Sequence, residues 1–86
     1  MESLFEINIL TPEKTAYKGK ISSLVVRAQL GDLGVFASHA PLIAHLVPGR
    51  ISFKEESGKQ TVIYSKGKGF LEVLKNNVTL LMDDIQ

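Results

Sequence analysis

The 86-residue sequence contains no cysteine. A disulfide framework, a zinc site with thiolate ligands and a cysteine nucleophile are therefore all impossible. This absence excludes the small secreted scaffolds that disulfides hold together. A chain of this length buries roughly 60–65% of its unfolded surface when it folds. We expect residues 1–86 to form a single small domain with little room for a deep active-site cleft.

The sequence also lacks an excess of charge of one sign. Residues 1–47 carry four basic and four acidic side chains, and residues 48–86 carry six and five. Proteins that bind nucleic acid or anionic membrane surfaces usually gather positive charge on one side. The even balance therefore argues against both kinds of partner.

Long hydrophobic runs are absent as well. The longest apolar stretches are far too short to cross a bilayer, which requires about 20 apolar residues. The N-terminus, Met1-Glu2-Ser3, lacks the cationic segment and apolar run of a signal peptide. We expect a soluble protein that can still dock onto a membrane complex.

Short segments rich in β-branched and aromatic residues lie between recurrent glycines and prolines. Several of these segments alternate apolar and polar residues, which is the period of a half-buried strand. Val25 falls on the more polar face of its segment, so it is a candidate for a surface that a partner covers. The expected strands are residues 5–9, 15–18 (ended by Gly19), 20–28, a strand starting at Ile51, 61–65, 70–74 and 78–82.

The turns between these segments have signals of their own. Gly58 in "EESGK" predicts a hairpin, and Lys75-Asn76-Asn77 predicts a turn because asparagine tolerates positive φ. Residues 39–47 could form a helical segment instead, limited by Pro41 and Pro48 to about two turns. The sequence thus predicts an all-β sandwich or barrel of about eight to ten short strands, with little or no helix.

The most reactive side chains lie in "GDLGVFASHAPL", residues 31–42. Asp32, Ser38 and His39 are the residue types of a hydrolase. However, adjacent residues of an extended chain point to opposite faces, so a serine rarely reaches the histidine beside it. The GxSxG strand–turn–helix motif is also missing. The simpler interpretation is that Ser38 closes a turn and His39 bonds a backbone group.

Metal and phosphate sites have weak signals. His39 and His45 are the only histidines, and their spacing fits no common zinc pair. They would form a site with Asp32 only if the fold brought all three together. A Walker loop would need glycine at position 53, where Phe53 stands. We therefore expect no metal and no cofactor.

Nucleic-acid binding requires stacking aromatic rings interleaved with basic residues. Most of the two tyrosines and four phenylalanines are expected at inward-facing strand positions, where they would fill the core. A free-standing β-barrel that binds an oligonucleotide or a sugar, in the manner of OB-folds, is nevertheless the alternative hypothesis. No catalytic constellation emerges from the sequence.

Four motifs occur in order along the chain: "TPEK" after the first strand, "GDLGVFASHAPL", "LVPG" and "GFLEVLKNNVTLL". Together they resemble the epsilon subunit of F-type ATP synthases, which is called delta in mitochondria. The resemblance extends from about residue 4 to residue 84. This sequence differs from the family pattern at Asp32, where glutamate is usual, at Ala37-Ser38, where proline-glycine is common, and at Lys66–Gly69, where Ser-Gly-Gly is usual.

The resemblance implies a non-catalytic subunit of the central rotor stalk, located on the cytoplasmic face of the energy-coupling membrane, most often that of bacteria. Such a subunit packs on the gamma subunit and the c-ring and helps couple proton translocation to ATP synthesis. It would touch the membrane only through the complex. The implied c-ring contacts are Gly31, Asp32, Leu33 and Gly34. The implied gamma contacts are Val25, His39, Ala40, Pro41 and Leu42.

We expect Gly31 and Gly34 to let the chain turn tightly, so that Asp32 presents its carboxylate on a loop. An exposed carboxylate can accept charge-assisted hydrogen bonds across an interface. Family members usually continue into a C-terminal helical hairpin, whereas this sequence ends at Gln86. The resemblance therefore implies a polypeptide that assembles but neither inhibits hydrolysis through that hairpin nor binds ATP.

Overall fold

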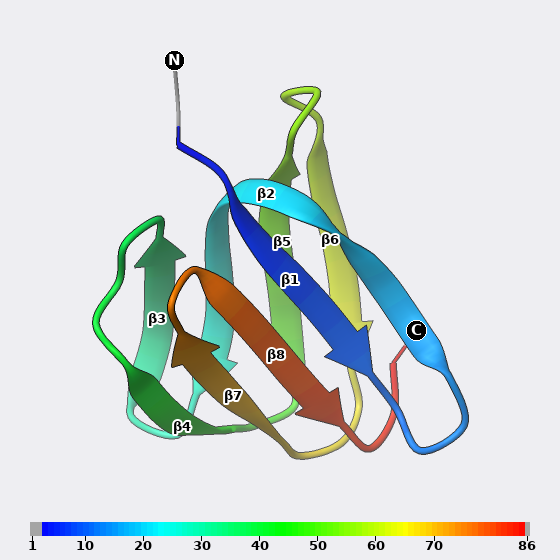
Figure 1. Cartoon of the computed structure of the whole chain (residues 1–86). Helices are drawn as coiled ribbons and strands as arrows, with labels where there is room; N and C mark the ends of the chain where they lie inside the picture. Colours follow the sequence, from blue (N-terminus) through cyan, green and yellow to red (C-terminus); the bar gives the residue numbers. More distant parts are fainter. Residues whose placement is uncertain (1–2, 86) are drawn as a thin grey trace.

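The computed structural model describes residues 3–85, and all regular elements within them are strands (Figure 1). The strands are β1 (Phe5–Leu10), β2 (Thr15–Ala28), β3 (Gly31–Phe36), β4 (Leu42–Leu46), β5 (Gly49–Glu55), β6 (Gln60–Ser65), β7 (Gly69–Leu74) and β8 (Asn77–Met82). These eight strands confirm the predicted all-β class. Within residues 3–85, no helix occurs that could cross a membrane.

The strands form two layers that are joined by β2. One layer contains β1, β8, β7 and β4 in that order, and the other contains β3, β2, β5 and β6. β1 runs parallel to β8, whereas the other ladders are antiparallel. Figure 1 shows β2 curving over one end of the molecule from layer to layer. The first half of β2 pairs with β1, and its second half pairs with β3 and β5.

β2 changes partners around Ser22. The register against β5 shifts between Ile21 and Ser23, which leaves Ser22 as an additional residue in the strand. Such a bulge bends a strand and increases its twist. The bend carries β2 out of its pairing with β1 and into the second layer.

The alternation of apolar and polar residues places one side of each strand in the core. Burial of these side chains is the main favourable term in folding, at roughly 25 cal/mol per Å² of apolar surface. The buried apolar residues are Phe5, Ile7, Ile9, Ile21, Leu24, Val26, Val35, Leu46, Ile51, Phe53, Leu71, Val73, Val78, Leu80 and Met82. They form one cluster to which both layers contribute.

A polar network links β2 to the β5–β6 hairpin. The Tyr17 hydroxyl donates a hydrogen bond to Glu55 Oε1 at 3.3 Å, and the Thr61 hydroxyl donates to Glu55 Oε2. The Tyr17 ring also packs on Phe53, with 4.7 Å between ring centroids. Desolvation, followed by the negative charge of Glu55, raises the pKa of Tyr17 above its ordinary value.

Three sequence expectations are wrong in detail. β2 is one strand of 14 residues, because Gly19 pairs with Ile7 inside the ladder and does not end it. Residues 42–46, within the possible helical segment, form β4. Half of the aromatic residues face outward, since Phe36, Tyr64 and Phe70 are exposed. Alternation explains this result, because their neighbours Val35, Ser65 and Leu71 are buried.

The turn predictions are confirmed. Gly58, in the β5–β6 hairpin, has φ +93°. The β7–β8 hairpin turns at Lys75 and Asn76, whose φ values are 50° and 61°. Positive φ at both central residues is the geometry of a type I′ turn, which matches the twist of the flanking strands.

Gly69 is the glycine at which an added side chain is expected to do the most damage. It pairs with Met82, and a Cβ there would overlap the Leu81 carbonyl oxygen and Met82 Sδ. Gly69→Ala should therefore lower the free energy of unfolding by about 1–3 kcal/mol, as overpacking does. Urea denaturation measures this loss. Gly34→Ala is the matched control, because a Cβ there meets only Phe36 Cε2 at 3.8 Å, and equal losses in both variants would contradict the packing of β7 on β8.

Candidate functional site

The β2–β3 hairpin carries the most exposed apolar side chain of the described residues. Ala28 pairs with Gly31, so the turn consists of Gln29 and Leu30. Gly31 has φ +126°, which suits glycine. The side chain of Leu30 is fully exposed, at 101%. Exposing this apolar side chain to water is unfavourable, and contact with a partner would remove its surface from water.

The base of this hairpin is attached to the end of β4. The Gln29 N–H donates to the His45 carbonyl and the Val47 N–H donates to the Arg27 carbonyl, each at 3.1 Å. In the described part of the chain, β3 itself has no ladder with β4. The sandwich is therefore open between β3 and β4.

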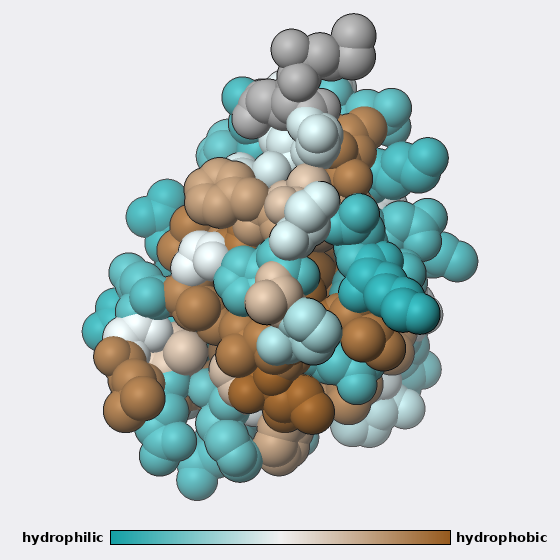
Figure 2. All heavy atoms as spheres, turned by 60° about the vertical axis from the view of Figure 1, so that its left-hand side comes forward, coloured by the Kyte–Doolittle hydropathy of each residue, from teal (hydrophilic) through white to brown (hydrophobic). Residues whose placement is uncertain are grey.

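A hollow of about 380 Å³ lies along this opening. We call it the β3–β4 hollow; its lining residues are Ala28, Gln29, Leu30, Gly31, Asp32, Leu33, Leu42, Ile43, Ala44 and His45. Figure 2 shows apolar side chains gathered in a broad band on the side of the molecule where β3 and β4 lie. Apolar surface of this kind commonly marks a contact with another protein.

The predicted c-ring contacts lie at one end of the hollow. Gly31, Asp32 and Leu33 line the hollow. Gly34, the next residue of β3, is paired with Val25 and is not among the lining residues. These residues belong to strand β3, and only Gly31 adopts a left-handed φ, so the expected loop with two glycine bends is wrong. Asp32 lies opposite Arg27, with Nε and Oδ1 3.9 Å apart. Both side chains are largely exposed, so this pair contributes less than about 1 kcal/mol to stability.

The predicted gamma contacts divide between two places. Leu42 lines the hollow but is half-buried and packs against the core, opposite the buried Val73. His39, Ala40 and Pro41 belong to the connection between β3 and β4. Residues 37–41 make up this connection, which we call the β3–β4 connection.

Val25 lies elsewhere, on the outer face of the second layer. It is 40% exposed. Its neighbour across the ladder is Gly34, which has no side chain to cover it. Val25 thus presents apolar surface, as expected, but on a different face from the hollow.

The three residues of the hydrolase hypothesis do not come together. Asp32 is near the hairpin turn, and the extended strand from it to Phe36 spans about 13 Å. Ser38 lies beyond that strand, and its backbone N–H donates to Asn76 Oδ1 at 2.6 Å. His39 Nδ1 is 2.7 Å from the Ala40 carbonyl oxygen. Among the residues that the structure describes, no group of three metal-ligating side chains is found either.

Sequence reasoning missed two apolar residues of the hollow, Leu30 and Ile43. Ile43 is 71% exposed, because Leu42 takes the inward position before it. The alternation of β4 was a signal for Ile43. The two-residue length of the hairpin turn, on which the exposure of Leu30 depends, was not visible in the sequence.

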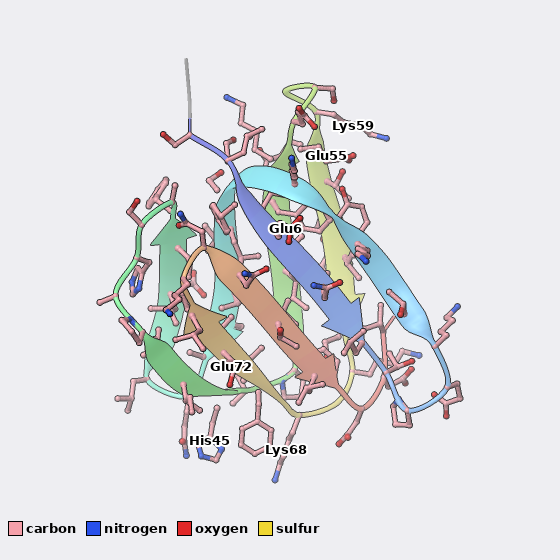
Figure 3. All side chains as sticks on the ribbon, in the orientation of Figure 1. Glu6, His45, Glu55, Lys59, Lys68 and Glu72 are labelled. Atoms are coloured by element: carbon pink, nitrogen blue, oxygen red, sulfur yellow. The ribbon has the colours of Figure 1, made fainter. Side chains whose placement is uncertain are left out.

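Another missed feature is an apolar row on the outer face of the first layer. Leu10, Leu81, Phe70 and His45 are paired in turn across β1, β8, β7 and β4. The rings of His45 and Phe70 are 4.8 Å apart. Figure 3 shows His45 and Lys68 pointing outward at the same end of the molecule. This row borders a pocket of about 290 Å³ that Leu10, Phe70 and Leu81 help to line.

Comparison with known proteins identifies the family. The family model described as "ATP synthase, Delta/Epsilon chain, beta-sandwich domain" matches residues 4–86. The chain belongs to this ATP synthase delta/epsilon family. The resemblance drawn from the four motifs is thereby confirmed.

Relatives of this delta/epsilon chain agree in sequence and in fold. The ATP synthase epsilon chain of Dichelobacter nodosus is 33% identical over 84 residues, which are 98% of this chain and 58% of that protein. The chain thus spans little more than half the length of that relative.

Two solved assemblies contain chains of the same fold. One is the Euglena gracilis mitochondrial ATP synthase, OSCP/F1/c-ring, with a TM-score of 0.90, 18% identity and coverage of 100% of this chain and 54% of that chain. The other is the central stalk/c-ring of the Tetrahymena thermophila mitochondrial ATP synthase, with a TM-score of 0.79, 16% identity and coverage of 99% and 67%.

Stability measurements can test the opposite orientations of Leu42 and Ile43, which decide which side chain faces the core and which is exposed at the hollow. Leu42→Ala removes a side chain that packs against the core, so the free energy of unfolding should fall by about 1–3 kcal/mol, less than for a fully buried leucine. Ile43→Ala, in the next position, should change it by less than about 0.5 kcal/mol. Chemical denaturation of both variants measures the difference, and a larger loss in Ile43→Ala would reverse the assigned orientation.

Proposed function

We propose that this protein is a non-catalytic subunit of the central rotor stalk of an F-type ATP synthase. It packs on the gamma subunit and on the c-ring, and it helps couple proton translocation to ATP synthesis. The single observation that carries the proposal is the match of residues 4–86 to the delta/epsilon β-sandwich domain. A peripheral location on the cytoplasmic face of the energy-coupling membrane follows from this role.

The c-ring contact in this proposal is the tip of the β2–β3 hairpin. It comprises Gly31, Asp32, Leu33 and Gly34, and we add Leu30 because of its full exposure. Leu30 supplies apolar surface, and the Asp32 carboxylate accepts hydrogen bonds from polar loops of the ring. A small apolar contact with a polar rim is the usual composition of a specific protein interface.

The gamma contact in this proposal begins at the other end of β3. His39, Ala40, Pro41 and Leu42 form its centre, and Ile43 extends it along the hollow with its exposed side chain. Val25 forms a separate part of the proposed contact, on the outer face of the second layer, together with Phe36, which shares that face, is 62% exposed and directly precedes the β3–β4 connection. Aromatic and large aliphatic side chains of this kind supply most of the binding energy of interfaces.

β3 therefore lies between the hairpin tip and the part of the gamma contact formed by residues 39–42. Residues 31 and 36 are the ends of this strand, about 17 Å apart at the rise of an extended strand. β3 is hydrogen-bonded along its length to β2, which crosses both layers. A force applied to the hairpin tip thus passes into the whole sandwich, as torque transmission through a rotor subunit requires.

Binding to the isolated gamma subunit tests the gamma contact. Val25→Glu and Ile43→Glu each place a charge in the proposed interface, and each should weaken binding at least tenfold, or about 1.4 kcal/mol. Isothermal calorimetry measures the change. Val62→Glu is the control, because Val62 is similarly exposed (37%) but lies on β6, two strands from Val25.

Unchanged affinity in both Val25→Glu and Ile43→Glu would show that gamma binds elsewhere, for example on the row of Leu10, Leu81 and Phe70. A loss of affinity in Ile43→Glu alone would restrict the contact to the hollow.

Proton pumping tests the c-ring contact. Asp32→Ala and Leu30→Asp should leave gamma affinity within about twofold, which is the usual effect of changes outside an interface. Both should lower the number of protons pumped per ATP hydrolysed in reconstituted membranes. Arg27→Ala is the control, since it removes the partner of Asp32 but keeps the carboxylate. Normal pumping in Asp32→Ala would mean that Asp32 is only a strand residue paired with Arg27.

A further inference from the structure

Asn76 connects three parts of the chain that are distant in sequence. It is the second residue of the β7–β8 turn. Its carbonyl oxygen accepts the backbone N–H of Glu6 at 2.9 Å, at the start of β1. Its side-chain Oδ1 accepts the backbone N–H of Ser38 at 2.6 Å, in the β3–β4 connection. Figure 1 shows the β7–β8 turn near the end of β3 from which this connection leaves.

The bond from Ser38 is the main restraint on the β3–β4 connection. Among the hydrogen bonds of the described residues, it is the one that joins residues 37–41 to another element. The His39 ring bonds only the carbonyl of its own neighbour, Ala40. Because β3 and β4 share no ladder, the distance between them at the end away from the β2–β3 hairpin depends on the course of this connection.

The backbone of Ser38 explains why a restraint is needed there. Ser38 has φ 63°, a left-handed conformation that glycine adopts freely and serine does not. Asparagine tolerates this conformation better than most residues, and Asn76, at φ 61°, adopts it as well. The hydrogen bond from Ser38 to Asn76 therefore stabilises a left-handed backbone conformation that serine disfavours.

We propose that Asn76 is a positioning residue for partner binding. By fixing the Ser38 amide, it presents His39, Ala40 and Pro41 in the conformation that the partner recognises and keeps the β3–β4 hollow open beside them. This inference rests on the proposed function, because it takes gamma to bind the β3–β4 connection.

Two substitutions in the same turn separate the effect of this hydrogen bond from that of the turn. Asn76→Gly keeps the left-handed backbone but removes the acceptor. Lys75→Gly is the matched control, since Lys75 also has a positive φ (50°), is exposed and lies one position earlier. Asn76→Asp keeps an oxygen at the same position and should restore the contact.

Amide hydrogen exchange at Ser38 and affinity for gamma are the two measurements. In Asn76→Gly, exchange at Ser38 should accelerate and the Kd for gamma should rise, each by about tenfold, as expected for the loss of one hydrogen bond. Lys75→Gly and Asn76→Asp should match the unsubstituted protein in both. Exchange at the buried Val26 amide shows whether each variant is folded.

The outcomes distinguish this inference from the proposed function. Faster exchange at Ser38 with unchanged gamma affinity would overturn the positioning role and leave the rotor proposal standing. Unchanged exchange at Ser38 and unchanged affinity in Asn76→Gly would show that the Ser38–Asn76 hydrogen bond does not restrain the β3–β4 connection. If the unsubstituted protein does not bind gamma at all, the proposed function fails, and the inference that rests on it fails too.

Discussion

The exchange of partners by β2 is the constraint on which the other features depend. A strand of 14 residues pairs first with β1 and then, beyond the bulge at Ser22, with β3 and β5. This single crossing joins the two layers on one side by a continuous hydrogen-bonded ladder. On the other side, β3 has β2 as its neighbour in the ladder, and the ladder between β4 and β2 consists of the pair Ala28 and Leu46. The opening between β3 and β4 is therefore a consequence of how β2 is shared, and several of the candidate docking residues line it.

An open edge is usually a liability in a β protein, because it invites unwanted pairing with other chains. Here the edge strand is six residues long and carries a charge and two glycines among its residues. These features weaken β3 as a template for another strand. The surface that we propose for a partner is the apolar hollow behind β3, with Leu30 and Ile43 at its rim. Side-chain contact in such a hollow gives specificity that backbone pairing alone does not.

Much of the fold could be predicted from the sequence, because alternation is a local signal. Val25 was correctly placed on the outer face by counting positions along one strand, and its neighbours Leu24 and Val26 are buried. Predictions failed where the answer depends on a distant neighbour. Gly19 resembled a strand end, but Ile7 across the ladder keeps it in β2. The hydrogen bond between Ser38 and Asn76 joins residues 38 positions apart, so no local sequence pattern predicts it. The candidate site is predictable only in part. The orientation of each side chain follows from local alternation, but which side chains lie near one another depends on the pairing of strands that are distant in sequence.

The pairing of Asp32 with Arg27 raises the question of whether its carboxylate is available to a partner. Nε and Oδ1 are 3.9 Å apart, beyond hydrogen-bond distance, and both side chains are more than half exposed. Water and salt screen such a pair, so separating it costs less than about 1 kcal/mol. A donor on a partner that excludes water would form a stronger bond with Asp32, because charge-assisted hydrogen bonds strengthen as the surroundings become less polar. Arg27 thus leaves the Asp32 carboxylate available to a partner in the free protein.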